Sequence, residues 1–534
     1  MKRKKILISL SVLFIFFVVL TNLNSINKAK IYKKVPLSTN MKKTSTTDHS
    51  KFEILKQKFK DPKDVTKACL SCHVKAGEQI LISKHWTWIC PKKQVGDAGK
   101  KFKINNFCIS LQSNEPRCTS CHIGYGWKDK NFDFKNPDNI DCLVCHEQTG
   151  TYKKFPTAAG YPVMEEKVFK GKKWFPPNLS KVAQSVTFPS IKNCGVCHFY
   201  GGGGDGVKHG DLDSSLYNPS RDLDVHLSKD GAGMDCVECH RTVNHKIGGG
   251  CTSRLDEGDK FKAPVVTCTD CHSQTPHSTV DYKYADIINQ HVDKVSCQAC
   301  HIPEFAREKP TKMYWDWSKA GKRDENGKPI VKKENGVMVY HGMKGAFVWK
   351  KNVVPEYFWW NKKGSVVLAT DKIDPSKQPI QINKLEGNYF DKDSKIYPFK
   401  VHRGKQVYDP IYKNFIMPKL FGKKGTGAYW AEYDWVKAAK AGMDYVGLPF
   451  SGKVDFIETE MFWPQNHMVA PEEKALRCDA CHSENSRLKN LEGVYLVGKD
   501  RSNFFDFIGI LIILLSLVGV LIHGLIRVVS SFKR

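Results

Sequence analysis

Alternation of apolar and polar residues, the signature of half-buried strands, is scarce between the cysteine-rich segments of this 534-residue chain. We therefore expect few strands. Cysteines outside one repeated pattern are also scarce: of 19 cysteines, only Cys90, Cys108 and Cys251 stand apart from it. Because sixteen of the nineteen cysteines follow one pattern, they are not an ordinary set of scattered buried thiols.

The repeated pattern is Cys, two spacers, Cys, His, and it occurs eight times. The copies are Cys69/Cys72/His73, Cys118/Cys121/His122, Cys142/Cys145/His146, Cys194/Cys197/His198, Cys236/Cys239/His240, Cys268/Cys271/His272, Cys297/Cys300/His301 and Cys478/Cys481/His482. We number them sites 1 to 8 in this order. Chance would produce about 0.02 copies in a chain of this composition.

Three chemistries use paired cysteines. A disulfide framework does not need a histidine after every second cysteine. A zinc site normally takes its remaining ligands from a second, distant pair. Covalent attachment of haem c needs two thiols about one helical turn apart for the vinyl groups, and a histidine for the iron. The pattern therefore predicts eight covalent haems, with the motif histidines as proximal ligands.

Haems at such close intervals would form much of the core themselves. We expect a mainly α fold, in which helices and long loops surround a stack of eight haems with little strand. Residues 302–477 carry no motif but are rich in aromatic side chains, which we expect to cover haem faces.

Most of these irons also need a distal ligand, and a second histidine makes a haem suited to electron transfer. Eleven histidines lie outside the motifs. His49 lies in a polar stretch, His523 in an apolar run, and His341 in a turn-like segment, so we exclude these three. The predicted distal ligands are His85, His209, His226, His245, His277, His291, His402 and His467.

The two ends of the chain indicate a membrane protein. Residues 1–25 have the basic start and apolar run of a signal peptide or an N-terminal anchor, and residues 26–60 read as a polar linker. Residues 61–500 form the expected octahaem domain. Residues 504–528 are predicted to be a transmembrane helix, with basic residues at its cytoplasmic end. We expect the inner membrane as location, the haem domain in the periplasm, and a quinol-oxidising b-type cytochrome or another membrane electron donor as partner.

Acidic residues are outnumbered, with 55 Asp and Glu against 83 Lys and Arg, which gives a formal charge of +28. Eight haems would add about sixteen propionate charges, which offsets much of this excess. An exported chain does not meet nucleic acid, so we exclude that partner. The remaining positive charge favours a small anionic substrate.

Long segments resemble one family, the octahaem tetrathionate reductases. They are "KHWTW" (84–88), "NNFC" (105–108), "CTSCHIGYGWKD" (118–129), "CLVCHEQTGTYKKFP" (142–156), "CGVCHFYGGGGDGVKHGDLDSS" (194–215), "TKMYWDWSKAGK" (311–322), "HRGKQVYDP" (402–410) and "ETEMFWPQNHMVAP" (458–471). The resemblance covers roughly residues 65–490. It implies a haem arrangement similar to that of hydroxylamine oxidoreductase and pentahaem nitrite reductase, and reduction of tetrathionate to thiosulfate, with nitrite and hydroxylamine as further substrates.

The resemblance also implies that the second haem is the active one and that a lysine amine binds its iron. We match this lysine to Lys181 in "PPNLSKVAQ", with Lys153 and Lys154 as alternatives. The family pattern places an acidic residue three positions earlier, where this chain has Asn178. Asn178 is also expected to cap the helix that holds Lys181.

Two of the free cysteines are candidates for catalysis. Cys108 lies ten residues before site 2, and a thiolate near a metal and lysines is reactive. Cys90 is a weaker candidate. The alternatives to a reductase are a hydroxylamine-oxidising enzyme, which would need a tyrosine cross-linked to the active haem, and a pure electron conduit with eight bis-histidine haems.

Overall fold

The computed structural model describes residues 47–89, 100–101, 103–249, 266–279, 284–496, 500 and 502–532. The first half of this part consists of short helices joined by long loops. They are α2 (Pro62–Cys72), α3 (Ala76–Leu81), α4 (Lys84–Thr87), α5 (Glu115–Cys118), α6 (Leu143–His146), α7 (Leu179–Gln184), α8 (Ile191–His198), α9 (Cys236–Cys239), α10 (Ala285–His291) and α11 (Cys297–His301). Two short hairpins lie among them, formed by β1 (Lys167–Phe169) with β2 (Lys172–Trp174), and by β3 (Thr242–Val243) with β4 (Lys246–Ile247).

Each CxxCH motif lies on one helical turn. At sites 1, 5, 6 and 8, the histidine N–H donates to the carbonyl of the first cysteine, at 2.8 Å in every case. A single turn places residues i and i+3 on the same face, so both thiols point the same way. The local structure therefore provides the thiol spacing that attachment to two vinyl groups requires.

The second half of the chain forms a nine-stranded mixed sheet in the order β11-β15-β13-β5-β8-β7-β6, with β9 and β14 also paired to β13. Its strands are β5 (Thr311–Asp316), β6 (Val331–Glu334), β7 (Val337–His341), β8 (Gly345–Lys350), β9 (Glu356–Trp360), β11 (Ile380–Gln381), β13 (Lys395–Asp409), β14 (Asn414–Phe415) and β15 (Asp455–Pro464). Beside the sheet, β10 (Gly364–Val366) pairs with β12 (Asn383–Leu385), and α12 (Tyr429–Glu432) is followed by α13 (Trp435–Val446).

The expectation of a mainly α fold with little strand is wrong. The central strand β13 pairs with β15 over ten residue pairs, from Phe399↔Pro464 to Tyr408↔Asp455. Almost every residue of β13 is buried, on both faces of the sheet. Because β13 buries polar side chains, including Lys400, His402 and Gln406, its sequence is neither a continuous apolar run nor a regular alternation, and it did not predict a strand.

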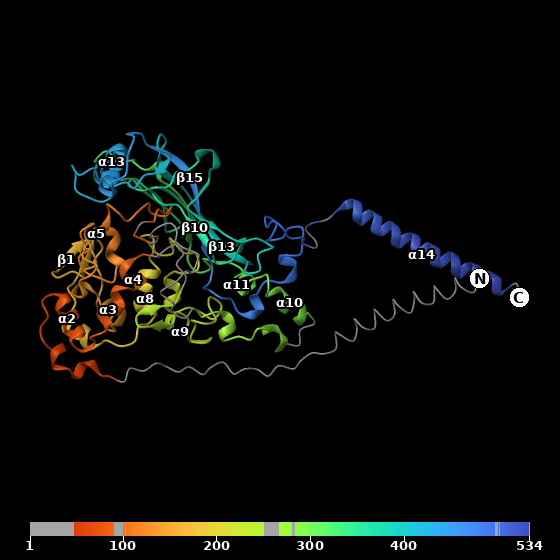
Figure 1. The fold of residues 1–534 in the computed structure, drawn as a ribbon, viewed down its shortest axis with the longest axis horizontal. Coiled ribbons are helices and arrows are strands. Elements are labelled where there is room, and N and C mark those ends of the chain that lie inside the picture. Colours follow the sequence, from red (N-terminus) through yellow and green to blue (C-terminus); the bar gives the residue numbers. More distant parts are fainter. Residues whose placement is uncertain are drawn as a thin grey trace.

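Figure 1 shows the sheet lying against the helical half, which carries the first seven motifs. The largest apolar cluster gathers around the sheet and includes Trp315, Trp317, Phe347, Phe415 and Trp463. The aromatic residues of the motif-free segment therefore build a protein core of their own, and some of them also reach the haem-binding half.

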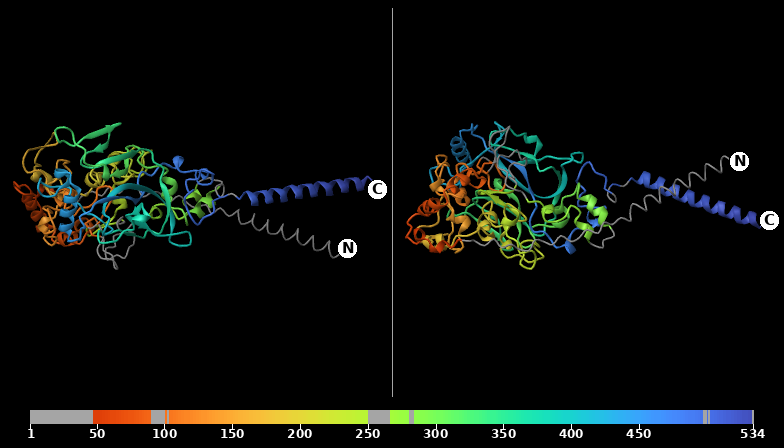
Figure 2. Two further views of the ribbon diagram at one scale, coloured as in Figure 1. Left: turned by 90° about the horizontal axis from the view of Figure 1, so that it is seen from above. Right: turned by 60° about the horizontal axis from the view of Figure 1, so that its bottom comes forward.

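The last described helix, α14 (Asn503–Ser531), is 29 residues long, apolar, and exposed along its whole length. It is long and apolar enough to cross a membrane, and it covers the segment expected to do so. Figures 1 and 2 show it projecting from the end of the body where α10 and α11 lie.

Candidate active site and electron path

Seven motif histidines each face a second histidine across a gap. The ring centroids are separated by 6.2 Å for His73 and His49, 6.5 Å for His146 and His245, 6.0 Å for His198 and His85, 6.3 Å for His240 and His467, 6.1 Å for His272 and His226, 6.4 Å for His301 and His277, and 6.1 Å for His482 and His291.

These separations fit a metal ion held between two imidazoles. A metal–imidazole bond of about 2 Å on each side, plus about 1 Å from each nitrogen to its ring centre, adds up to about 6 Å. A narrow range repeated at seven sites indicates that each gap is shaped for the same object. The adjacent paired thiols identify that object as a haem bound on both faces.

Site 2 differs from the other seven. Among the described residues, no second histidine ring faces His122. Its Nε2 lies 2.6 Å from the carbonyl oxygen of Trp86, and its ring is fully buried. Aromatic rings surround it with centroids 4.9 to 6.1 Å away, from Trp86, Trp88, Trp127, Phe132 and Phe134. A haem without a distal histidine is the one that can bind a substrate.

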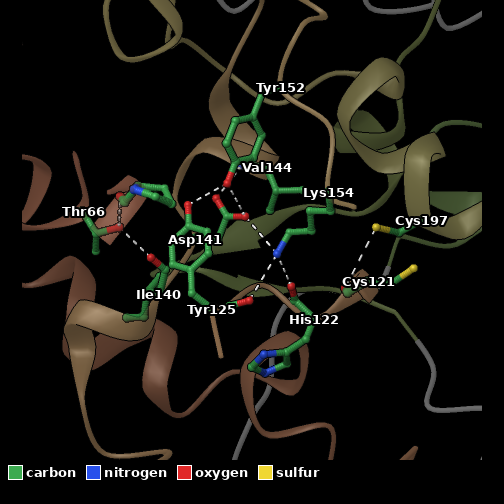
Figure 3. A network of polar contacts seen from close by, with 12 residues as sticks. Thr66, Cys121, His122, Tyr125, Ile140, Asp141, Val144, Tyr152, Lys154 and Cys197 are labelled. Atoms are coloured by element: carbon green, nitrogen blue, oxygen red, sulfur yellow. Dashed lines mark hydrogen bonds and ion pairs between the residues drawn. The ribbon is translucent and has the colours of Figure 1, made fainter. Parts of the chain in front are cut away.

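A buried ion pair supports the backbone on which His122 lies. Lys154 Nζ lies 2.9 Å from Asp141 Oδ2, with side chains 7% and 0% exposed (Figure 3). Lys154 Nζ also donates to the carbonyl oxygens of His122 and Gly124. The same carboxylate oxygen also accepts a hydrogen bond from the Tyr152 hydroxyl at 3.0 Å. The amine of Lys154 is therefore fully engaged and supports the proximal segment of site 2.

Another lysine has the properties that a metal-binding amine needs. Burial and, to a smaller extent, the charge of Lys100 lower the pKa of Lys208 to about 7. The Lys208 amine lies 4.7 Å from the centre of the Trp463 ring. The same Lys100 charge acts on His122, Cys118 and Cys121 of site 2. Asp205 precedes Lys208 by three positions, where the resemblance to the octahaem tetrathionate reductases implies an acidic residue, whereas Lys181 has Asn178 there.

Cys108 lies beside the attachment thiol of site 2. A hydrogen bond with the Cys118 thiol is the main cause that lowers the pKa of Cys108 to about 7, and the charges of Lys344, Lys312 and Arg117 contribute further. Cys118 becomes a thioether once haem is attached, so the lysine charges are the part of this shift that persists. Cys108 is thus a thiol in a basic setting at the edge of site 2.

A basic hollow opens near the same place. It has a volume of about 300 Å³ and is lined by Arg117, Pro156, Phe169, Lys170, Lys172 and Trp174. Arg117 directly precedes Cys118. Burial is the main cause that lowers the pKa of Lys344; the charges of Arg117 and Lys170 also lower this pKa, whereas the nearby Cys108 raises it. Positive side chains therefore continue from the surface hollow to the edge of site 2.

The attachment thiols also show which sites are neighbours. Thiols of different sites approach one another between Cys69 and Cys142, Cys145 and Cys194, Cys121 and Cys197, Cys194 and Cys236, Cys239 and Cys271, Cys268 and Cys297, and Cys300 and Cys481. The contacts join the sites in the order 8–7–6–5–4–2. Site 3 branches from site 4, and site 1 is joined to site 3. The order from site 8 to site 2 is an unbroken path from the helix α14 end of the body to site 2.

The structure separates the predicted ligands into two groups. It pairs His85, His226, His245, His277, His291 and His467 with motif histidines. His209 and His402 face no motif histidine among the described residues. His209 packs against Trp463, and the two ring nitrogens of His402 have no hydrogen-bond partner there. His49 takes the seventh position and was missed because its polar neighbours resemble a linker; in the structure, the segment that follows it packs against α7 through the buried Leu55.

The structure does not bring Lys181 or Asn178 to site 2. The Asn178 side chain caps α7 by accepting from the Lys181 backbone N–H at 3.0 Å, as expected from the sequence, but both residues are solvent-exposed. Lys153 is exposed as well. Cys90 and Cys251 lie outside the described residues. His341 pairs with no motif histidine within the described chain, and its Nδ1 accepts from the Met343 N–H.

Comparison with known proteins agrees with the repeated geometry. A family model described as "Cytochrome c bacterial" matches residues 312–485, the sheet and the last motif. The crystal structure of an octahaem cytochrome c from Shewanella oneidensis is 42% identical, with a TM-score of 0.71, and the match covers 83% of this chain and 95% of that one. The chain belongs to the multihaem c-type cytochromes, in the family of that octahaem protein.

Membership of this family means that the protein carries covalently bound haem c and has a redox function. A further relative, an uncharacterised protein of Archaeoglobus fulgidus, is 25% identical over 245 residues, which is 38% of this chain and 80% of that protein. In the structure, a second histidine faces the motif histidine at every motif but the second, which is the arrangement that would bind a haem iron from both faces.

Proposed function

We propose that the protein binds eight haems and is a reductase of small sulfur or nitrogen oxo-anions, with tetrathionate as the first candidate substrate. The observation that carries the proposal is the asymmetry between site 2 and the others. Seven sites have two facing histidines, which suits electron transfer, and site 2 has one. A pure conduit needs no such exception.

The residues around site 2 suit an anionic substrate. Arg117, Lys170 and Lys172 line the hollow, and the charge of Arg117 also acts on Cys108. Tetrathionate is a dianion that takes up two electrons when its central S–S bond breaks, and gives two thiosulfate ions. Fixed positive side chains stabilise the charge that develops in this step.

We propose Lys208, in place of Lys181, as the lysine that binds the iron at site 2. A lysine binds a metal only as the neutral amine, and the pKa of about 7 makes that form available near neutral pH. Asp205 accepts hydrogen bonds from Ser214 and Lys309, so it is held in a fixed position on the same loop.

The path of neighbouring sites suggests where electrons enter. Site 8 is joined to site 7 and follows the sheet shortly before α14, which fits a membrane donor. We propose that α14 anchors the protein in the inner membrane with the haem domain in the periplasm. A quinol-oxidising cytochrome would then reduce site 8, and the electrons would pass to site 2.

Turnover assays test the proposal most directly. The purified protein is reduced with a viologen, and its reoxidation is followed after addition of tetrathionate, nitrite or hydroxylamine. Rapid reoxidation by at least one of them, lost in the Cys118→Ala/Cys121→Ala variant, is the expected result. If none of the three substrates reoxidises the reduced protein, the protein is a pure electron conduit and not a reductase of these compounds. A covalent tyrosine–haem cross-link in the mass spectrum would instead favour the hydroxylamine-oxidising enzyme.

A further inference from the structure

One distal histidine on the proposed path has a buried carboxylate behind it. His467 Nδ1 donates to Asp211 Oδ2 at 3.1 Å, and the Asp211 side chain is 1% exposed. The same oxygen accepts from the backbone N–H groups of Asn466 at 2.7 Å and of His467 at 2.9 Å. Three donors thus hold the carboxylate in place against the ring that faces His240 at site 5.

Among the described residues, the ring nitrogens of the other distal histidines have a neutral hydrogen-bond partner or no hydrogen-bond partner. His245 Nδ1 contacts the amide oxygen of Gln79 at 2.8 Å, His277 Nδ1 contacts that of Asn289 at 3.2 Å, and His291 Nδ1 contacts the carbonyl of Ile287 at 2.7 Å. On the proximal side of site 5, His240 Nδ1 lies 2.8 Å from the carbonyl oxygen of Gly248. Among the described sites, site 5 is therefore the one at which a carboxylate, that of Asp211, contacts the ring of a distal histidine, His467.

A carboxylate behind a metal-bound imidazole makes that ligand more basic. The more basic ligand stabilises ferric iron over ferrous iron, and the negative charge itself, in a region of low dielectric, acts in the same direction. Both effects lower the reduction potential of the bound haem.

We propose that Asp211 gives the haem at site 5 the lowest reduction potential on the path from site 8 to site 2. This rests on the electron path proposed above. An electron on site 5 is then higher in free energy than on either neighbour. Electrons collect in two pools, one at sites 6 to 8 near α14 and one at sites 1 to 4 around the catalytic haem. The inner pool supplies several electrons to one substrate without waiting for the donor.

The test is a spectropotentiometric titration of the haem-loaded, full-length protein without substrate. In Asp211→Asn, which keeps a hydrogen-bond acceptor but removes the charge, we expect one of the eight components, the lowest, to move to a more positive potential. The low-spin electron paramagnetic resonance signal of one bis-histidine haem should change in the same variant. Haem content, measured by mass spectrometry, should equal that of the wild type.

Two further variants make the result decisive. Asp224→Asn is the matched control, because Asp224 is also buried and near His467 but accepts only from the backbone of Met468, His226 and Leu227. It should shift the lowest component less than Asp211→Asn does. Gln79→Glu introduces a carboxylate behind His245, and should move a different component to a more negative potential.

The proposal is overturned if the Asp211→Asn titration superimposes on that of the wild type, or if Asp224→Asn gives an equal shift. If Asp211→Asn does not fold, Gln79→Glu decides the question. An unchanged titration of Gln79→Glu would show that a carboxylate behind a distal histidine does not control the reduction potential. Absence of tetrathionate turnover would count against the proposed reductase but not against this result, because no substrate is present.

Discussion

The ring of His49 lies 6.2 Å from the ring of His73, at an interplanar angle of 27°. This pairing assigns a residue of an apparent linker to the distal side of site 1. We expect His49→Ala to retain all attached haems, because the thioether bonds do not depend on the distal ligand. One low-spin bis-histidine signal should be lost in electron paramagnetic resonance, and a high-spin signal should appear.

His341→Ala is the control for this experiment, because His341 faces no motif histidine among the described residues. It should leave the spectrum unchanged. An unchanged spectrum in His49→Ala would show that another residue binds the first iron.

The sequence predicted much of the haem-binding half and little of the sheet. The motifs contain their own local structure, since Cys, Cys and His lie on one helical turn. Counting ligands selected six of the seven histidines that face a motif histidine in the structure. Pairing is a property of the tertiary structure, which is why His49 was excluded and why His209 and His402 were included. The resemblance was matched to Lys181, although Asp205 three positions before Lys208 was a signal in the sequence for the other lysine. Burial, which only the tertiary structure shows, is the second difference between the two lysines.

The buried ion pair of Lys154 and Asp141 should be important for stability. Lys154→Met leaves Asp141 with a buried, unpaired charge and removes the donor to the carbonyls of His122 and Gly124. Breaking a buried pair in this way costs about 3–5 kcal/mol. We expect the midpoint of denaturant unfolding, followed by circular dichroism, to fall clearly.

The neighbouring Lys153→Met is the matched control, because Lys153 is exposed, and it should change stability by less than about 0.5 kcal/mol. The double variant Lys154→Met/Asp141→Asn should recover part of the loss, since no unpaired charge remains. Equal midpoints for Lys154→Met and Lys153→Met would contradict a structural role for the pair.

The lowered pKa of Lys208, about 7, predicts how stability and the haem signal change with pH. Between pH 7 and the ordinary lysine pKa of about 10.4, the unfolded chain binds a proton that the folded chain does not, so this group's contribution to stability rises with pH in that window. The neutral amine is present above pH 7. The low-spin signal of a lysine-bound haem should therefore grow as the pH is raised from 6 to 8.

In Lys208→Met this pH-dependent signal should disappear, while the signals of the seven bis-histidine sites remain. Lys181→Met, which changes an exposed lysine, should behave as the wild type. If Lys181→Met loses the signal and Lys208→Met keeps it, the original match from sequence is correct.

The basic hollow should accelerate capture of anionic substrates. Lys170→Glu and Lys172→Glu reverse two of the charges that line it. We expect kcat/KM for tetrathionate or nitrite to fall by about tenfold at low ionic strength, mainly through KM, and the difference to shrink in high salt because screening weakens steering. Lys332→Glu, on the exposed strand β6, makes the same change in net charge and should have little effect. An equal loss in all three variants would mean that net charge alone, and not the hollow, attracts the substrate.

Removal of α14 tests whether this helix anchors the protein. A chain ending at residue 502 keeps all eight motifs and the whole sheet, so it should retain its haems and its turnover with a viologen as donor. Once residues 1–25 are removed as a signal peptide, the truncated protein should appear in the soluble periplasmic fraction, whereas the full chain should resist carbonate extraction from membranes. A truncated protein that stays on the membrane would show that residues 1–25 are an uncleaved anchor. Reduction by quinol in isolated membranes should be lost on truncation, since site 8 is no longer held near its donor. A full-length protein that carbonate releases intact would show that α14 does not span the bilayer.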